Sequence, residues 1–174
     1  MSRAPSITRR HVLAAMGAVP VVGALGAGAV AWQWWDRPAG DGLKALSVDE
    51  HAFVQALAEA WMPHGGTPPI SGAEARLGDF FDDVVGAMAP DQAVELKLLL
   101  QALDDLPRLT HLGTPFRALT LEARIAQLDA WVHHDQWLLR NGAVALIALL
   151  GGGYTTHPEV LPMLSPWFKC AYGR

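Results

Sequence analysis

Apolar residues recur along most of this chain at intervals of three and four residues, and this helical spacing restricts the possible fold more than any other feature. The clearest example begins at Ser47-x-x-Glu50, a motif in which each side chain bonds the other residue's backbone N–H at a helix start. The apolar residues that follow fall on one helical face, and they are Phe53, Val54, Leu57 and Trp61. Because no segment alternates apolar and polar residues between hairpin turns, the sequence predicts an all-α fold.

Two further helices are predicted downstream of this segment. Proline and glycine residues at 63–69 end the first helix in a loop, and a second Ser-x-x-Glu box at Ser71 and Glu74 predicts the start of the next helix. Pro90 suits the first position of a third helix, where its missing N–H has no helical partner to lose. The apolar faces of the second and third helices consist of Leu77, Phe80, Phe81, Val84, Val85 and Met88, and of Leu96, Leu99, Leu100, Leu103 and Leu106.

The sequence of the last third of the chain predicts two more helices, followed by a non-helical C-terminal arm. Thr120 is a suitable N-cap for a helix whose apolar residues are Leu121, Ile125, Leu128, Val132 and Leu139. Asn141-Gly142 is a candidate interruption. Residues 143–150 are apolar on all sides, as in a helix buried in the core or under a partner, and the three glycines at 151–153 are expected to end it. The sequence predicts an irregular bundle of about five helices with a proline- and aromatic-rich, non-helical C-terminal arm.

The N-terminus carries the pattern of a twin-arginine export signal, which directs proteins to a route that transports folded chains. Arg9 and Arg10 stand directly before residues 12–32, which contain no charge and are rich in Ala, Gly and Val. As a helix, this uncharged stretch would span about 31 Å, enough for a bilayer core. Two interpretations remain open: a signal helix cleaved after Ala-Val-Ala at 29–31, or a retained membrane anchor. Both interpretations place the rest of the chain, from residue 36 onward and called the body below, in the periplasm.

These patterns divide the chain into an export signal or anchor at 1–35, a linker at 36–46 and a helical domain at 47–174. The charges are unevenly distributed. The chain has 13 Lys and Arg against 17 Asp and Glu, but its first ten residues hold three arginines and no acid. The body is therefore acidic, and we expect no nucleic-acid partner, because nucleic-acid binding requires a basic patch.

The only dense group of metal-ligating side chains is His133-His134-Asp135. Adjacent residues on a helix point about 100° apart, so these two histidines do not easily share a metal, and exposed or partner-facing polar residues are the simpler interpretation. His157 would supply a third ligand if the fold brought it close. A stand-alone periplasmic metal-binding protein or enzyme that uses these histidines is therefore the alternative hypothesis, and a membrane-tethered structural protein is another.

The sequence contains no other catalytic pattern. There is no G-x-S-x-G motif and no phosphate-binding loop. The single cysteine, Cys170, excludes an internal disulfide and an iron–sulfur cluster. The carboxylate pairs Asp82-Asp83 and Asp104-Asp105 diverge on a helix and are expected on solvated faces.

The C-terminal stretch combines prolines with aromatic residues, which are enriched at protein interfaces. Packing on the domain's own core is an equal alternative. Cys170 is either a partner in an intermolecular disulfide or a free thiol. The candidate interface residues of this stretch are Tyr154, His157, Pro158, Trp167, Phe168 and Cys170.

Four sequence segments, which together extend along nearly the whole chain, resemble segments that occur in the same order in a known protein family. They are TRRHVLAAMG at 8–17, DEHAFVQALAEAWMPHGGTPP at 49–69, GDFFDDVVGAM at 78–88 with GTPFRALTLEARIAQLDAW at 113–131, and GGGYTTHPEV at 151–160. In these features the chain resembles the gluconate 2-dehydrogenase subunit 3 family, the small accessory subunits of membrane-bound, flavin-dependent sugar and sugar-acid dehydrogenases.

The resemblance implies a small subunit with no catalytic residues of its own. Its partner would be a large FAD-dependent dehydrogenase of the glucose–methanol–choline type, which carries the FAD and lacks an export signal. The small subunit would bind this partner, supply the signal at Arg9 and Arg10, and cross with it in folded form to the periplasmic face of the inner membrane. In this family a cytochrome c subunit often anchors the assembly and accepts the electrons.

Overall fold

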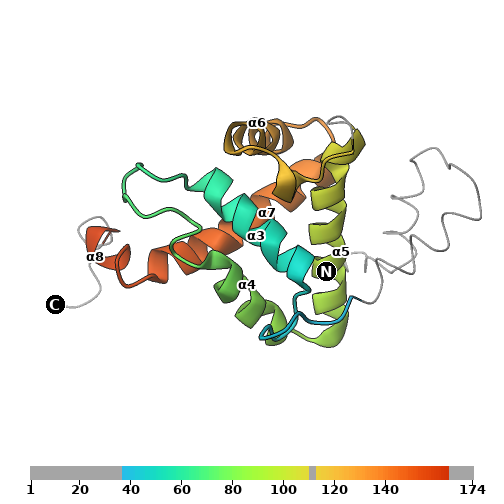
Figure 1. Ribbon diagram of the computed structural model, residues 1–174, viewed down its shortest axis with the longest axis horizontal. Helices are drawn as coiled ribbons and strands as arrows, with labels where there is room; N and C mark the ends of the chain where they lie inside the picture. The colour runs from blue at the N-terminus through green and yellow to red at the C-terminus, as the bar shows by residue number, and fades with distance from the viewer. Residues whose placement is uncertain (1–36, 110–112, 165–174) are drawn as a thin grey trace, which may run out of the picture. The chain divides into compact units, whose positions relative to one another are not determined.

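The computed structural model describes residues 37–109 and 113–164, so the predicted export segment and the last ten residues lie outside the described residues. Within the described ranges the chain forms six α-helices, two short 3₁₀ helices and no strand (Figure 1). The elements are α3 (Val48–Trp61), α4 (Leu77–Gly86), α5 (Pro90–Asp105), η1 (Leu106–Leu109), η2 (Phe116–Ala118), α6 (Leu121–Val132), α7 (Trp137–Thr156) and α8 (Leu161–Leu164). The prediction of an irregular all-α bundle is confirmed.

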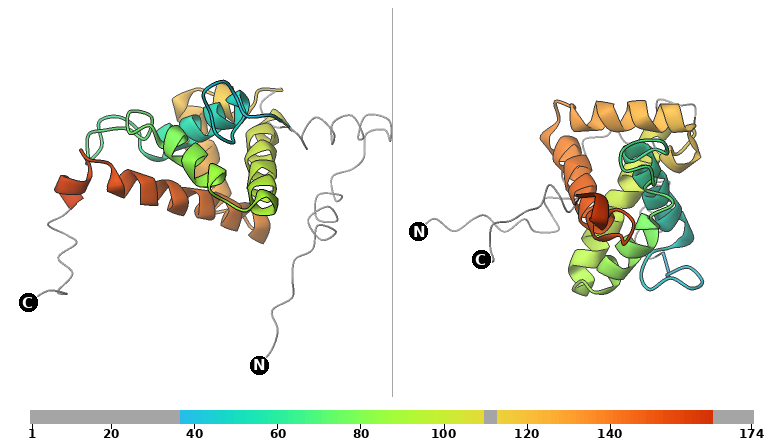
Figure 2. Two further views of the ribbon diagram at one scale, coloured as in Figure 1. Left: turned by 90° about the horizontal axis from the view of Figure 1, so that it is seen from below. Right: turned by 90° about the vertical axis from the view of Figure 1, so that its left-hand side faces the viewer.

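Helix α3 lies at the centre of the bundle and contacts α4, α5, α6, α7 and η2 (Figure 1). Phe53 of α3 meets Phe116 of η2 edge-on, with ring centroids 5.4 Å apart, and Phe116 stacks on Trp131 of α6 at 4.9 Å. All three rings are buried. Burial of aromatic surface of this size is a main source of stability in a domain of this length. Figure 2 shows α7 along the outer edge of the bundle, with α8 at its end.

The Ser47–Glu50 capping box forms as predicted at the start of α3. The backbone N–H of Ser47 donates to the Glu50 carboxylate at 2.7 Å, and the Glu50 N–H donates to the Ser47 hydroxyl at 3.3 Å. The predicted starts at Pro90 and Thr120 are also confirmed, because Pro90 occupies the first turn of α5 and the Thr120 hydroxyl accepts from the N–H of Ala123.

The second Ser-x-x-Glu box makes both of its hydrogen bonds, between Ser71 and Glu74, but it does not open a helix. A turn follows, and α4 begins only at Leu77, after Arg76 in the left-handed conformation. Tertiary packing explains the difference. A Cβ at Gly72 would lie 2.2 Å from the carbonyl oxygen of Ala58, so this turn is shaped by its contact with α3 rather than by its capping box.

The C-terminal helices differ from the prediction in three ways. Leu139 belongs to α7 rather than to the helix that begins after Thr120, and Asn141-Gly142 does not interrupt α7. The glycines at 151–153 do not end α7, which continues to Thr156. A Cβ at Gly153 would lie 2.4 Å from the ring of Phe80, so this glycine permits close packing inside the helix. The helix ends at His157 because Pro158 disfavours a helical conformation in the residue before it.

The C-terminal arm contains one turn of helix, α8, where the sequence predicted none. Val160, at the start of this turn, is fully buried, and its N–H donates to the carbonyl of His157 at 3.0 Å. The buried valine therefore fixes the described part of the arm onto the end of the bundle.

Candidate partner-binding surface

The outer side of α7 is exposed and apolar along much of its length. Trp137, Leu138 and Val144 are respectively 64%, 56% and 47% exposed. No charged residue occurs in residues 141–156. The opposite side of α7 packs into the core through Ala143, Leu146, Leu150, Gly153 and Tyr154. The sequence predicted a helix that is buried in the core or under a partner, and α7 is buried in the core on one side only.

Small residues make up much of the rest of the outer side of α7, which also carries the half-buried Asn141 and Thr155 and the exposed Thr156. Ala145, Ala148 and Gly152 are exposed there. Small side chains allow another solid surface to approach a helix backbone closely, which increases van der Waals contact. We call the exposed apolar and small residues of this side the α7 face, and they are Trp137, Leu138, Val144, Ala145, Ala148 and Gly152. Single exposed apolar residues are normal on protein surfaces, whereas a continuous apolar face is typical of an interaction site.

The arm presents further apolar surface beyond the end of α7. Leu161 and Met163 are exposed, whereas Val160 is buried and Leu164 packs against the core. Pro158, a predicted interface residue, is also exposed. The described part of the arm therefore packs partly on the domain's own core and partly faces solvent.

Two other predicted interface residues serve the chain's own structure. Tyr154 is only 2% exposed, and its hydroxyl donates a hydrogen bond to the carbonyl of Ile70 at 2.6 Å. Its ring meets Trp61 edge-on at 6.1 Å, and burial, with a smaller contribution from the Glu74 carboxylate, raises the pKa of the Tyr154 phenol. His157 caps the C-terminus of α7, and its N–H donates to the carbonyl of Tyr154.

The remaining sequence-predicted residues, Trp167, Phe168, Cys170, Arg9 and Arg10, lie outside the described residues.

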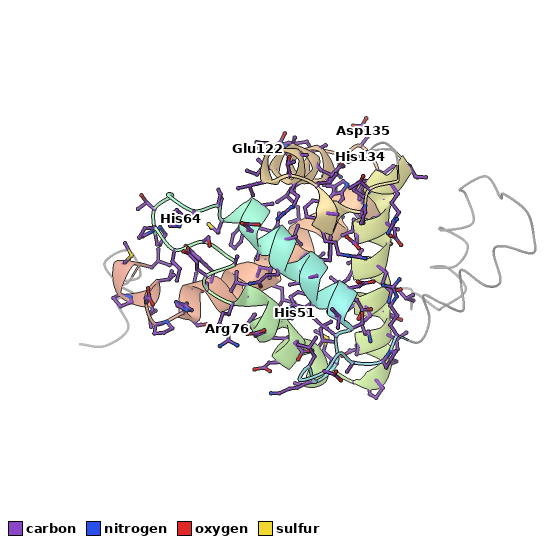
Figure 3. The ribbon with its side chains drawn as sticks, in the orientation of Figure 1. His51, His64, Arg76, Glu122, His134 and Asp135 are labelled. Carbon is purple, nitrogen blue, oxygen red and sulfur yellow. The ribbon has the colours of Figure 1, made fainter. Side chains whose placement is uncertain are left out.

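The three histidines of the metal hypothesis do not come together. His133 and His134 lie at the connection between α6 and α7, where Figure 3 labels His134. The Nδ1 atom of His133 lies 2.9 Å from the backbone oxygen of Asp129 and 3.2 Å from its carboxylate. His157 lies at the other end of α7, and a helix of 20 residues separates the two sites by ~30 Å. No group of three or more potential metal ligands occurs among residues 37–109 and 113–164.

Both predicted solvated carboxylate pairs contain one buried member, so this prediction is wrong for Asp82 and Asp104. Asp82 accepts three backbone hydrogen bonds from the segment before α3, and Asp104 pairs with the guanidinium of Arg117 and accepts the Arg117 N–H at 3.0 Å. Burial raises the pKa of the Asp104 carboxyl. Asp83 is exposed as predicted and pairs with Lys44, whereas Asp105 is half-buried and pairs with Arg108.

A buried polar cluster between α3 and α5 was not identified from the sequence. Gln101 donates its side-chain N–H to the carboxylate of Glu50, and the Lys97 ammonium lies 3.5 Å from the same carboxylate. Glu50 and Gln101 are buried. The helical spacing of Lys97 and Gln101 on α5 is the one sequence signal for this cluster. The charges of the cluster are paired within the chain, so we assign it a structural role.

Comparison with family models, curated proteins and solved structures gives no match to this chain. None of the helices in the described ranges is both long and apolar enough to span a membrane.

Proposed function

We propose that this chain is a non-catalytic small subunit of an exported oxidoreductase complex. It binds a folded FAD-dependent dehydrogenase of the glucose–methanol–choline type, supplies the twin-arginine signal of the pair and stabilises the partner in the periplasm. A cytochrome c subunit is a further candidate member of the assembly. The observation that carries the proposal is the α7 face, because an uncharged helix side with Trp137 and Val144 exposed favours cover by another protein.

The chemistry of the α7 face defines what its partner must present. An unpaired charge on the partner would lose its hydration against this face without gaining a counter-ion, which is costly. The partner surface is therefore uncharged where it meets residues 141–156. A solid protein surface gains more from Ala145, Ala148 and Gly152 than a lipid surface does, because these residues offer close packing but little apolar area to insert.

The N-terminal sequence supports the export part of the proposal. Arg9 and Arg10 stand directly before an uncharged stretch, and the twin-arginine route carries folded proteins. A small helical domain has no evident need for that route by itself. A partner that must acquire FAD in the cytoplasm has such a need, because the cofactor has to be bound before export.

The experiment is affinity purification of the full chain with a tag after Arg174, from its native host, with the visible spectrum of the eluate recorded. We expect a large subunit in equal amount with the absorption spectrum of oxidised flavin. The variant Val144→Asp places a charge in the α7 face and should reduce the recovered large subunit at least about tenfold.

The matched control is Ile125→Asp. Ile125 is also β-branched and helical, and it is 40% exposed on α6 outside the α7 face. Ile125→Asp should retain the partner, and both variants should keep the thermal stability of the wild type. Equal recovery of the large subunit with Val144→Asp and wild type would reject the α7 face as the contact. A colourless chain without a partner would reject the proposed function.

A further inference from the structure

Residues 37–46 connect the predicted export segment to α3, and a side chain of a later helix fixes them to the body. The carboxylate of Asp82, on α4, accepts hydrogen bonds from the backbone N–H groups of Lys44 at 2.7 Å, Ala45 at 3.0 Å and Leu46 at 2.8 Å. Asp82 and Leu46 are both buried. Hydrogen bonds to a charged acceptor are stronger than neutral ones, so Asp82 holds three consecutive residues of the connection.

A second side chain fixes the same segment through its backbone carbonyl oxygens. The ammonium of Lys97, on α5, donates to the carbonyl of Arg37 and to that of Ala45, each at 2.9 Å, and lies 3.5 Å from the Glu50 carboxylate. Two of the three N–H donors of the ammonium make these hydrogen bonds, and the Glu50 carboxylate pairs with the same ammonium by charge. The guanidinium of Arg37 also pairs with Asp49 at 3.1 Å. We call Asp82 and Lys97 together with these contacts the 37–46 anchor.

The 37–46 anchor depends on the tertiary fold. Asp82 lies 36 to 38 residues beyond the amides that it binds, and Lys97 lies 52 and 60 residues beyond the two carbonyls. Contacts of this sequence separation require closure of a long loop, so they form only when α3, α4 and α5 have packed together. In a chain whose body has not folded, the same segment has none of these partners.

We propose that the 37–46 anchor makes retention of the export signal conditional on folding of the body. In the folded chain the anchor holds residue 37 and residues 44–46, so cleavage of this segment requires local opening, although Pro38, Ala39, Asp41, Gly42 and Lys44 are exposed. A protease therefore cleaves the peptide bonds of residues 37–46 slowly while the body is folded. In an unfolded body a protease hydrolyses one of these bonds with one water molecule, which leaves a new carboxylate on the fragment with Arg9 and Arg10 and a new amine on the body. An unfolded body thereby loses its signal. This inference rests on the proposed function in so far as residues 1–36 are the export signal.

The test is limited proteolysis and amide hydrogen exchange on the purified full chain without a partner. Thermolysin, which cuts before large apolar residues, probes Leu43 and Leu46, and hydrogen exchange reads the N–H groups of residues 44–46. The variant Asp82→Asn removes the charged acceptor, and we expect at least about tenfold faster cleavage and exchange in this segment. Unchanged cleavage and exchange in Asp82→Asn would overturn the proposal.

Asp83→Asn is the matched control, because Asp83 is the neighbouring carboxylate on α4 and contacts the segment through the exposed side chain of Lys44, at 2.8 Å, rather than through its backbone. This variant should keep wild-type protection. If Asp82→Asn fails to fold, the test uses the wild type alone and compares the cleavage rate of residues 37–46 in the folded chain with the rate in the urea-unfolded chain. Equal rates would overturn the proposal. The proteolysis and exchange measurements use the isolated chain, so their failure can be distinguished from a failure of the partner purification.

Discussion

The hydroxyl of Tyr154 on α7 donates to the carbonyl of Ile70, a residue 84 positions earlier in the chain, at a distance of 2.6 Å. This bond joins the end of α7 to the proline-rich loop after α3, and Trp61 packs against the same ring. The loop and the helix are therefore held in one arrangement at the end of the bundle where α8 begins.

Tyr154→Phe should lower the free energy of unfolding by about 1 kcal/mol, because it removes one hydrogen bond and keeps the buried ring. Tyr154→Ala should cost about 3–5 kcal/mol, since it also removes the aromatic packing. Urea denaturation followed by circular dichroism measures both values. Equal losses for the two variants would show that the hydroxyl, rather than the ring, carries the contribution of Tyr154.

Adjacent glycines of α7 should respond to alanine in opposite directions. A Cβ at Gly153 would lie 2.4 Å from the ring of Phe80, so Gly153→Ala should destabilise by about 1–3 kcal/mol. A Cβ at Gly152 meets nothing within 4 Å, so Gly152→Ala should stabilise the helix by about 0.5–1 kcal/mol. Thermal unfolding of the two variants is the measurement. A stabilising Gly153→Ala would contradict the observed packing of α7 on α4.

Arg117→Met should destabilise the chain by about 3 kcal/mol or more, because it leaves the Asp104 carboxylate buried without its counter-charge. The double variant Arg117→Met with Asp104→Leu should recover most of this loss, since it removes the unpaired charge. Urea denaturation of the wild type and the three variants of this cycle gives the coupling free energy. A coupling near zero would show that Asp104 and Arg117 act independently.

The 37–46 anchor should persist in moderately acidic solution. Burial by itself raises the pKa of Asp82, but the three backbone hydrogen bonds outweigh it and hold the pKa below its ordinary value of 3.8. Because the pKa of Asp82 is lower in the folded state, its contribution to the stability of the fold is complete above pH 3.8. This contribution is lost as the pH falls through the pKa of Asp82 in the folded state. Hydrogen-exchange protection of residues 44–46 should therefore survive at pH 4 and disappear at lower pH. Its loss well above pH 4 would contradict this assignment.

The sequence predicted those features that depend on residues near one another in the chain. The box at Ser47 and Glu50, the start at Pro90 and the cap at Thr120 are local, and all three form. The box at Ser71 is equally local in pattern, but the contact of Gly72 with the backbone of Ala58 determines its conformation.

Features that depend on distant partners were not predictable in the same way. A glycine either ends a helix or permits close packing, and only the position of Phe80 decides between these roles at Gly153. The buried carboxylate of Asp82 has the same sequence context as the exposed one of Asp83, and its backbone partners at 44–46 lie too far along the chain to be inferred. The exposed side of α7 could not be predicted either, because the sequence of an all-apolar helix does not show which of its sides the bundle covers.

The most direct test of the proposed function is the location of the flavoprotein that co-purifies with this chain when its signal is altered. In cells that carry Arg9→Lys with Arg10→Lys, we expect the small subunit and a flavin-loaded large subunit to remain together in the cytoplasm. In wild-type cells both should be recovered from the periplasmic or membrane fraction. Delivery of the large subunit to the periplasm in the double variant, as in the wild type, would contradict the claim that this chain supplies the export signal.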